Sequence, residues 1–163
     1  MGVWIKMINH TDVKKAIYEY EDKTIQNLNE VLSYDFPPET DTVLFEVHSG
    51  GYGVFGISIT PMTKGEEMGY DSIETLLRKT HFEIDLEQFL DLDNDKPYDE
   101  KYMDKLGNLK KIVFNLIIPF FSECFHKARY IPPHIQFYIR THESDDVFNL
   151  QNKTWVEIED LYE

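Results

Sequence analysis

The sequence predicts an α+β fold, with a small antiparallel sheet of about four strands packed against an N-terminal helix and a long apolar helix. Three patterns predict this class. Apolar and polar residues alternate on both sides of a glycine cluster over 42–60, and apolar residues recur at helical spacing over 12–33 and 103–129. The 163 residues contain no internal repeat, low-complexity tract or long Gly/Ser linker, so we expect a single domain over 1–163.

The first helix is predicted over 12–33. Thr11 or Asp12 is a suitable N-cap, because a side-chain oxygen there accepts a hydrogen bond from an unpaired N–H group of the first turn. The Phe-Pro-Pro run at 36–38 ends the helix, since proline lacks a backbone donor and restricts the residue before it. The apolar face is formed by Val13, Ile17, Tyr20, Leu28 and Val31.

An antiparallel hairpin is predicted over 42–60. Segments 42–48 and 54–60 alternate apolar and polar residues, which is the period of a strand with one buried face. Residues 49–53 between them include three glycines, and glycine supplies the positive φ that tight connections need.

Two further strands are predicted at 81–87 and 134–140 from the same alternation. Asp71 and Glu74 resemble a capping box ahead of a short helix. The tail 143–163 fits either a short helix packed on the sheet or one more strand, because its apolar residues are interleaved with acids.

The long helix over 103–129 is the dominant apolar feature. Its apolar stripe is broad, which is typical of a helix buried on most of its circumference. Pro119 is expected to kink or divide it, at a cost of about 3 kcal/mol in an interior turn. The acidic segment 91–104 before it is predicted to be a surface loop.

Charge and composition exclude several classes of protein. The chain has 30 acidic and 16 basic side chains, a net charge of −14, so we expect no direct binding to nucleic acid or to an anionic membrane. The longest nearly uncharged stretch, 112–122, is shorter than the ~20 apolar residues of a membrane span. Cys124 is the single cysteine and the N-terminus has no signal-peptide pattern, so we expect a cytoplasmic protein.

The acidic surplus is unevenly distributed. Residues 105–142 have a net charge of +5, and the other residues together have −19. Acidic runs most often only face solvent, but aromatic residues among the acids are typical of a protein interface. We expect Trp155 itself to be buried. The predicted partner-binding residues are Asp91, Asp93, Asp95, Asp99, Glu100, Asp145, Asp146 and Glu157.

No catalytic residue, cofactor or metal site is predicted. Residues 91–99 begin like a calcium loop, but Lys96 stands where the bend needs glycine and Tyr102 where a bidentate Glu is needed. The glycine cluster lacks the spacing of a phosphate-binding loop. Cys124 and His126 diverge on a helix, so Cys124 is expected in the core. The remaining histidines show no zinc-binding spacing.

The overall plan resembles the small acidic immunity proteins of bacterial polymorphic-toxin and contact-dependent inhibition systems. The resemblance lies in the helix at 12–33, the hairpin at 42–60, the helix near 103–129, the strand at 134–140, and the acidic segments 91–104 and 143–163. It implies a protein that binds a toxin, often a basic nuclease, and blocks its active site or substrate groove by mimicking a polyanion. No family residue is carried over.

Two hypotheses of function follow. The first is a non-enzymatic acidic protein, an immunity protein or antitoxin, that neutralises a basic toxin by electrostatic occlusion. The alternative is a small ligand-binding or enzymatic domain whose site lies beside the 42–60 hairpin, near His48 and Tyr52. Assembly into a homo-oligomer through exposed apolar positions remains open.

Overall fold

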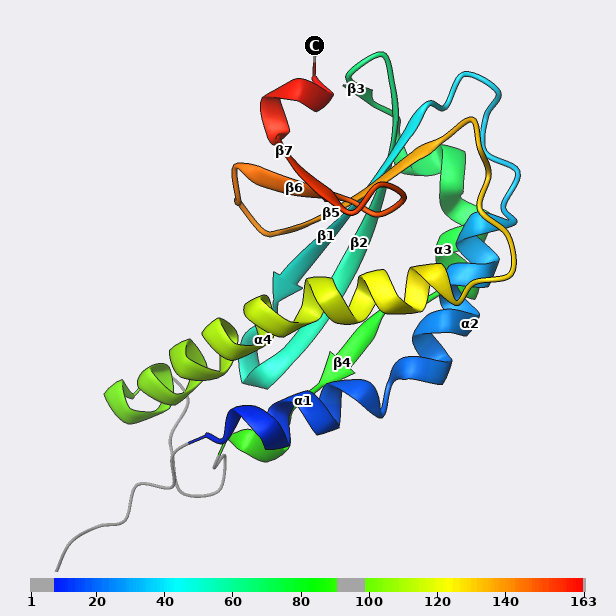
Figure 1. The fold of residues 1–163 in the computed structure, drawn as a ribbon. Helices are drawn as coiled ribbons and strands as arrows, with labels where there is room; N and C mark the ends of the chain where they lie inside the picture. Colours follow the sequence, from blue (N-terminus) through cyan, green and yellow to red (C-terminus); the bar gives the residue numbers. More distant parts are fainter. Residues whose placement is uncertain (1–7, 91–98, 163) are drawn as a thin grey trace, which may run out of the picture.

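The computed structural model describes residues 8–90 and 99–162 and confirms the α+β class (Figure 1). The helices are α1 (His10–Tyr18), α2 (Glu21–Leu32), α3 (Glu74–Lys79) and α4 (Glu100–His126). Within these described ranges seven strands form one sheet, more than the predicted four. They are β1 (Thr42–Ser49), β2 (Val54–Thr63), β3 (Glu66–Glu67), β4 (Glu83–Asp85), β5 (Gln136–Thr141), β6 (Asp146–Asn149) and β7 (Thr154–Glu157).

The sheet is mixed, so the prediction of an antiparallel sheet is wrong. The strand order is β3-β2-β1-β5-β6-β7, with β4 also paired to β2. β1 pairs with β2 in antiparallel and with β5 in parallel orientation. The parallel pair arises because α4 is a crossover that returns the chain to the end of the sheet where β1 begins.

The predicted hairpin is confirmed. β1 and β2 pair from Thr42 opposite Met62 to Ser49 opposite Phe55. The connection contains Gly53 at φ 78°, and a Cβ added there would lie 3.1 Å from the Leu90 side chain, so both backbone conformation and space require glycine.

The single helix predicted over 12–33 is wrong, because the chain bends between α1 and α2. Tyr20, at φ −89° and ψ 5°, lies in this bend, and its hydroxyl accepts a hydrogen bond from the backbone N–H of Asp85 on β4 at 3.1 Å. This tertiary contact holds the bend. The N-cap is also different from the prediction: Asn9 Oδ1 accepts hydrogen bonds from the backbone N–H groups of Thr11 at 2.8 Å and of Asp12 at 3.4 Å.

α4 is continuous from Glu100 to His126. Of the two effects expected of Pro119, a kink or a division of the helix, the division does not occur. Pro119 lies on the exposed side of the helix, and so does Asn115, whose carbonyl would otherwise pair with residue 119. The carbonyl that loses its partner therefore meets solvent instead of the core.

Other local predictions hold in part. α3 is the expected short helix, but a 3₁₀ turn at Tyr70–Ile73 precedes it and replaces the capping box. The strand expected at 81–87 shortens to β4, and the strand expected at 134–140 is β5. The tail forms β6, β7 and a 3₁₀ turn at Ile158–Leu161, where a single helix or strand was expected.

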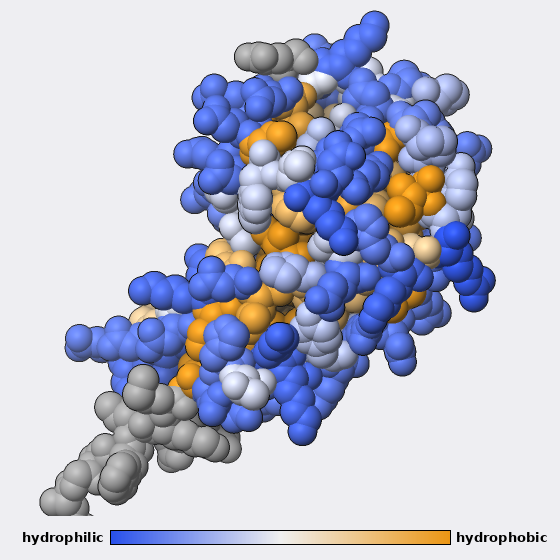
Figure 2. Space-filling model, viewed as in Figure 1, coloured by the Kyte–Doolittle hydropathy of each residue, from blue (hydrophilic) through white to orange (hydrophobic). Residues whose placement is uncertain are grey.

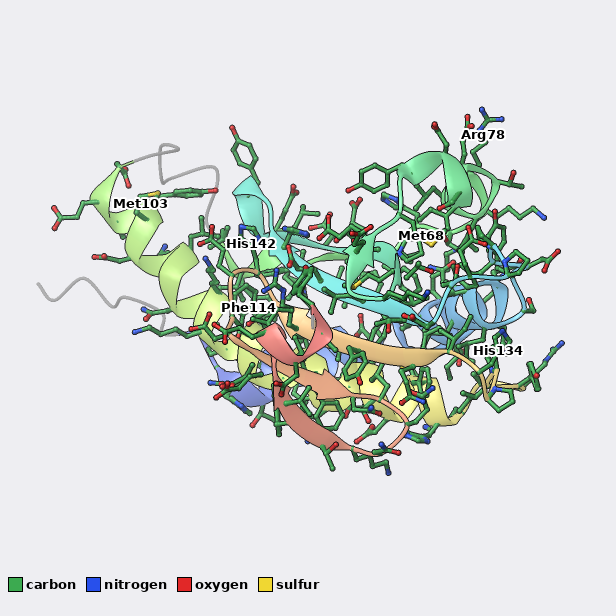
Figure 3. All side chains as sticks on the ribbon, turned by 90° about the horizontal axis from the view of Figure 1, so that it is seen from above. Met68, Arg78, Met103, Phe114, His134 and His142 are labelled. Atoms are coloured by element: carbon green, nitrogen blue, oxygen red, sulfur yellow. The ribbon has the colours of Figure 1, made fainter. Side chains whose placement is uncertain are left out.

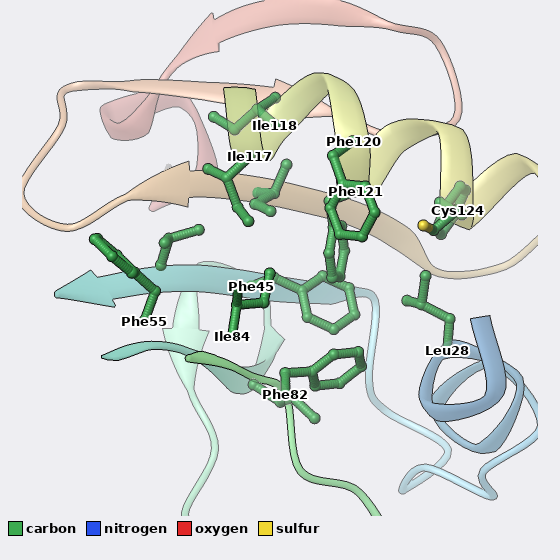
Figure 4. Packing of buried hydrophobic residues seen from close by; sticks show 14 of the residues in the cluster. Leu28, Phe45, Phe55, Phe82, Ile84, Ile117, Ile118, Phe120, Phe121 and Cys124 are labelled. Atoms are coloured by element: carbon green, nitrogen blue, oxygen red, sulfur yellow. The ribbon is translucent and has the colours of Figure 1, made fainter. Parts of the chain in front are cut away.

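The core lies between α4 and the sheet, with Phe45 of β1 at its centre (Figure 4). The Phe45 ring lies 4.9 Å from that of Phe121 on α4, 6.0 Å from Phe82 and 6.4 Å from Phe137. All these rings are buried, and such contacts between aromatic rings stabilise a core beyond the area they bury.

A second, smaller hydrophobic cluster covers part of the opposite face of the sheet. Leu44, Met62 and Val147 are buried there against the C-terminal segment. This segment therefore covers part of the side of the sheet that the helices leave open. In the described part of the chain, no helix has the length and apolar content needed to cross a membrane.

α1 is attached to α4 by a polar contact at the margin of the core. The Tyr18 hydroxyl donates a hydrogen bond to Glu123 Oε2 at 2.8 Å, and its ring meets Phe120 edge-on at 5.1 Å. Burial, followed by this hydrogen bond to a carboxylate, raises the pKa of Tyr18 to about 12. Lys127 of the α4 C-cap forms an ion pair with Glu21 of α2.

We expect Phe45→Ala to lower the free energy of unfolding by about 3–5 kcal/mol, because it leaves a cavity among the rings of Phe82, Phe121 and Phe137. Tyr130→Ala, at a side chain that is 59% exposed, is the matched control and should change it by less than about 0.5 kcal/mol. Urea unfolding followed by circular dichroism measures both. Equal effects of the two changes would contradict the central place of Phe45.

Candidate functional site

A polar cluster occupies the face of the sheet opposite α4. We define this polar cluster as Glu46, His48, Ser58, Arg140 and His142. Because side chains alternate along a strand, burial of Phe45 and Val47 under α4 directs their neighbours Glu46 and His48 to the other face. The register places Ser58 of β2 and Arg140 of β5 opposite Glu46.

The carboxylate of Glu46 is the centre of this cluster. Arg140 donates to Glu46 Oε2 from Nε at 2.7 Å and from Nη2 at 2.6 Å. The other oxygen, Oε1, lies 2.9 Å from His142 Nδ1 and 3.2 Å from His48 Nε2. The two imidazole rings are 4.7 Å apart. Figure 3 shows His142 beside the sheet, away from the projecting end of α4 that Met103 marks.

The cluster keeps Glu46 ionised. Its side chain is only 15% exposed, and this burial raises the pKa, but the hydrogen bond from His142 and the charge of Arg140 outweigh burial and lower the pKa below its ordinary value. Arg140 also donates from Nη1 to the carbonyl of Ser144 at 3.0 Å, which ties the turn after β5 to the cluster.

A shallow groove adjoins the polar cluster. Its volume is about 310 Å³ and it is open to solvent. The residues that line it include the polar His48, Ser58 and His81 and the apolar Ile57, Leu77 and Phe82. His48 belongs to both the groove and the cluster, so a histidine and a carboxylate lie in mutual reach beside the hairpin.

A second candidate surface is an acidic and aromatic ribbon formed by β6 and β7. We define this ribbon as Asp146, Phe148, Trp155 and Glu157, which share one face of the strand pair. Trp155 is 57% exposed, so the prediction that it is buried is wrong. Its ring packs against Phe148 at 5.3 Å. Figure 2 shows hydrophilic side chains interspersed with hydrophobic ones around the C-terminal strands.

Asp146 and Glu157 lie directly opposite each other in the ribbon, and both are exposed. Like charges at opposed positions of an antiparallel pair destabilise it. The ribbon therefore carries an unfavourable charge pair beside an exposed aromatic ring, at an edge strand of the described sheet.

The predicted partner-binding residues fall into separate groups. Asp145, Asp146 and Glu157 come together at the ribbon, where the backbone N–H of Ile158 donates to the carbonyl of Asp145 at 2.7 Å. Asp99 and Glu100 lie instead at the projecting N-terminal end of α4 (Figure 1). Three further predicted residues, Asp91, Asp93 and Asp95, lie outside the described residues.

Asp99 has a structural role. Its Oδ1 accepts a hydrogen bond from the backbone N–H of Tyr102 at 2.8 Å and so caps α4. Loss of such a cap typically costs a helix about 0.5–2 kcal/mol. The Tyr102 hydroxyl in turn accepts a hydrogen bond from the backbone N–H of Tyr52 at 2.9 Å, which joins α4 to the hairpin.

Sequence reasoning did not find the polar cluster as a group. The alternation of β1 does place Glu46 and His48 on one face, and His48 was named for the alternative site beside the hairpin. His142 is 94 residues from His48 in sequence and joins the cluster only through the parallel pairing of β1 with β5. No spacing rule for metal ligands covers such a pair.

Comparison with protein-family models, with curated proteins and with solved structures finds no match to this chain. The polar cluster, the groove and the ribbon are therefore the observations on which a function can be argued.

We expect Asp146→Lys to raise the free energy of unfolding by about 0.2–1 kcal/mol, because an opposed pair of like charges becomes a pair of opposite charges. The double variant Asp146→Lys/Glu157→Lys restores like charges and should return stability to the level of the unaltered protein. Urea unfolding at low salt measures the three. Destabilisation by the single change would show that Asp146 has a structural role.

Cys124 should be unreactive in the folded protein. It is buried, and this burial raises the pKa of its thiol to about 12, so thiolate is scarce at neutral pH. A chromogenic disulfide reagent at pH 8 should label no thiol in the native chain and one per chain in urea. Rapid labelling of the native chain would contradict a core position for Cys124 and would favour a role of its thiol as a nucleophile.

Proposed function

We propose that this chain is a non-enzymatic acidic binding protein that docks a basic protein partner through the ribbon. The observation that carries the proposal is Trp155, an exposed aromatic side chain flanked by the opposed acids Asp146 and Glu157. Aromatic anchors surrounded by charged residues are typical of the energetically important part of protein interfaces.

Electrostatics favours a basic partner. A Lys or Arg of the partner placed between Asp146 and Glu157 would relieve the repulsion between these two carboxylates. The repulsion therefore destabilises the free chain but not the complex. The net charge of −14 also steers oppositely charged proteins toward the chain and raises their association rate. Glu159 and Asp160, exposed in the 3₁₀ turn after β7, extend the acidic surface.

The specific form of the proposal is an immunity protein that neutralises a basic toxin. The acidic surface would occupy the groove in which a toxic nuclease binds its polyanionic substrate, and Trp155 would anchor the complex. The proposal needs no catalytic group in this chain. A partner of this kind and the chain would act in the same compartment, which we propose is the cytoplasm.

The ribbon can be tested by comparing captured partners. Tagged chain and its Trp155→Ala and Asp146→Lys/Glu157→Lys variants are purified from the native host at low salt, and proteins enriched by the unaltered chain alone are identified by mass. We expect a basic protein among them. Its affinity, measured with purified components, should fall about 30-fold or more with Trp155→Ala and at least about tenfold between low and high salt.

Two matched variants control for general effects. Tyr130→Ala removes another exposed aromatic ring, and Glu30→Lys changes an exposed acid on α2. Both should leave affinity for the partner unchanged. The proposal fails if no basic partner separates the unaltered chain from the ribbon variants, or if affinity is indifferent to salt. Sedimentation of the isolated chain as a dimer through β7 would assign the ribbon to self-association instead.

A second candidate is a ligand-binding domain with its site at the groove. The observation that favours it is that His48 lines the groove and lies 3.2 Å from the carboxylate of Glu46. A shallow, open groove gives less enclosure than small-molecule sites usually have. We therefore place this function second to partner binding.

A further inference from the structure

We propose that Glu46, His48 and His142 form a binding site for a divalent transition-metal ion of the zinc class. One ligand atom from each residue, a carboxylate oxygen and two imidazole nitrogens, lies within 4.8 Å of the others. Imidazole nitrogen and carboxylate oxygen are ligands that zinc prefers. The site is independent of the ribbon and goes beyond the proposed partner binding.

The spacing of the ligand atoms suits a small cation. Two ligands of a tetrahedral zinc ion, each about 2.0–2.1 Å from the metal, lie about 3.4 Å apart. Glu46 Oε1 lies 2.9 Å from His142 Nδ1 and 3.2 Å from His48 Nε2, and all three ligand atoms lie within 4.8 Å of one another, so shifts of the two imidazoles suffice to surround a cation. Both imidazoles are about half exposed, at 41% and 48%, and can make these shifts without disturbing the core.

His142 is placed between two carboxylates. Its Nδ1 faces Glu46, and its Nε2 lies 3.5 Å from Glu143 Oε1. A neutral imidazole has one proton, so it can donate to only one of these carboxylates. In the free chain the proton on Nδ1 serves the hydrogen bond to Glu46; on metal binding the proton would move to Nε2, toward Glu143, and the lone pairs of Nδ1 and of Glu46 Oε1 would both face the cation.

The surroundings of the three ligands match those of metal sites in proteins. A ligating histidine commonly donates its other ring N–H to a carboxylate, as His142 can to Glu143, and a ligating carboxylate is itself hydrogen-bonded. Arg140 fulfils the second condition because both of its hydrogen bonds to Glu46 go to Oε2, which leaves Oε1 for the metal. The Ser58 hydroxyl, 3.1 Å from His48 Nε2, would give up that contact on binding.

Three protein ligands leave one tetrahedral position for water or another ligand. Open sites of this kind bind ligands or activate water, whereas structural zinc sites are closed by four protein ligands. His48 also lines the groove, so the metal would lie beside a space that a small ligand can enter. The positive charge of Arg140 is compensated by Glu46, and the site lies in a chain of net charge −14.

The test uses the isolated, tag-free chain after treatment with chelator. Zn²⁺ binding is measured by titration calorimetry, and Co²⁺ is added as a spectroscopic probe whose visible absorption reports tetrahedral coordination. We expect one ion per chain. His48→Ala and His142→Ala should each lower Zn²⁺ affinity at least about tenfold and abolish the Co²⁺ absorption. Both side chains are half exposed, so the variants should fold, which circular dichroism checks.

His81→Ala is the matched control. His81 Nε2 lies 2.5 Å from Glu83 Oε2, an exposed histidine–carboxylate pair that belongs to no three-ligand group in the described chain. This change should leave Zn²⁺ affinity unaltered. Absence of saturable one-to-one binding, or equal effects of His81→Ala and His142→Ala, would overturn the proposal. Neither result bears on partner binding, because the titration contains no other protein.

Discussion

β1 carries Phe45 and Val47 into the core beneath α4, and the alternation of a strand then forces Glu46 and His48 onto the opposite face. A largely buried carboxylate on that face needs compensation, which Arg140 supplies from the adjacent parallel strand. A slip of one residue in the pairing of β1 with β5 would turn Arg140 toward the phenylalanine rings. The core and the polar cluster therefore specify the same register.

α4 makes this pairing possible. A helix of 27 residues spans about 40 Å, which is long enough to cross the sheet and return the chain for a parallel strand. Its two ends are also tied to the rest of the fold. Near the N-terminal end the hydroxyl of Tyr102 binds the hairpin, and near the C-terminal end Glu123 binds Tyr18 of α1. The position of α4 thus fixes both the hairpin and the N-terminal helices.

Local sequence patterns predicted those elements that depend only on residues close to one another in the chain. The hairpin and α4 follow from periodicity and glycine placement, whereas the bend at Tyr20 depends on a hydrogen bond to Asp85, 65 residues away. Trp155 was misjudged for a related reason: an apolar ring is normally buried, but β7 is an edge strand of the described sheet and leaves the ring exposed. The polar cluster required the β1–β5 pairing, which no spacing along the chain reveals.

The polar cluster and the ribbon are joined by the short turn between β5 and β6. Arg140 holds the carbonyl of Ser144, and the Ser144 hydroxyl contacts the backbone of Asp146. The turn between β5 and β6 therefore positions both surfaces, because its hydrogen bonds connect Arg140 of the polar cluster to the backbone of Asp146 in the ribbon.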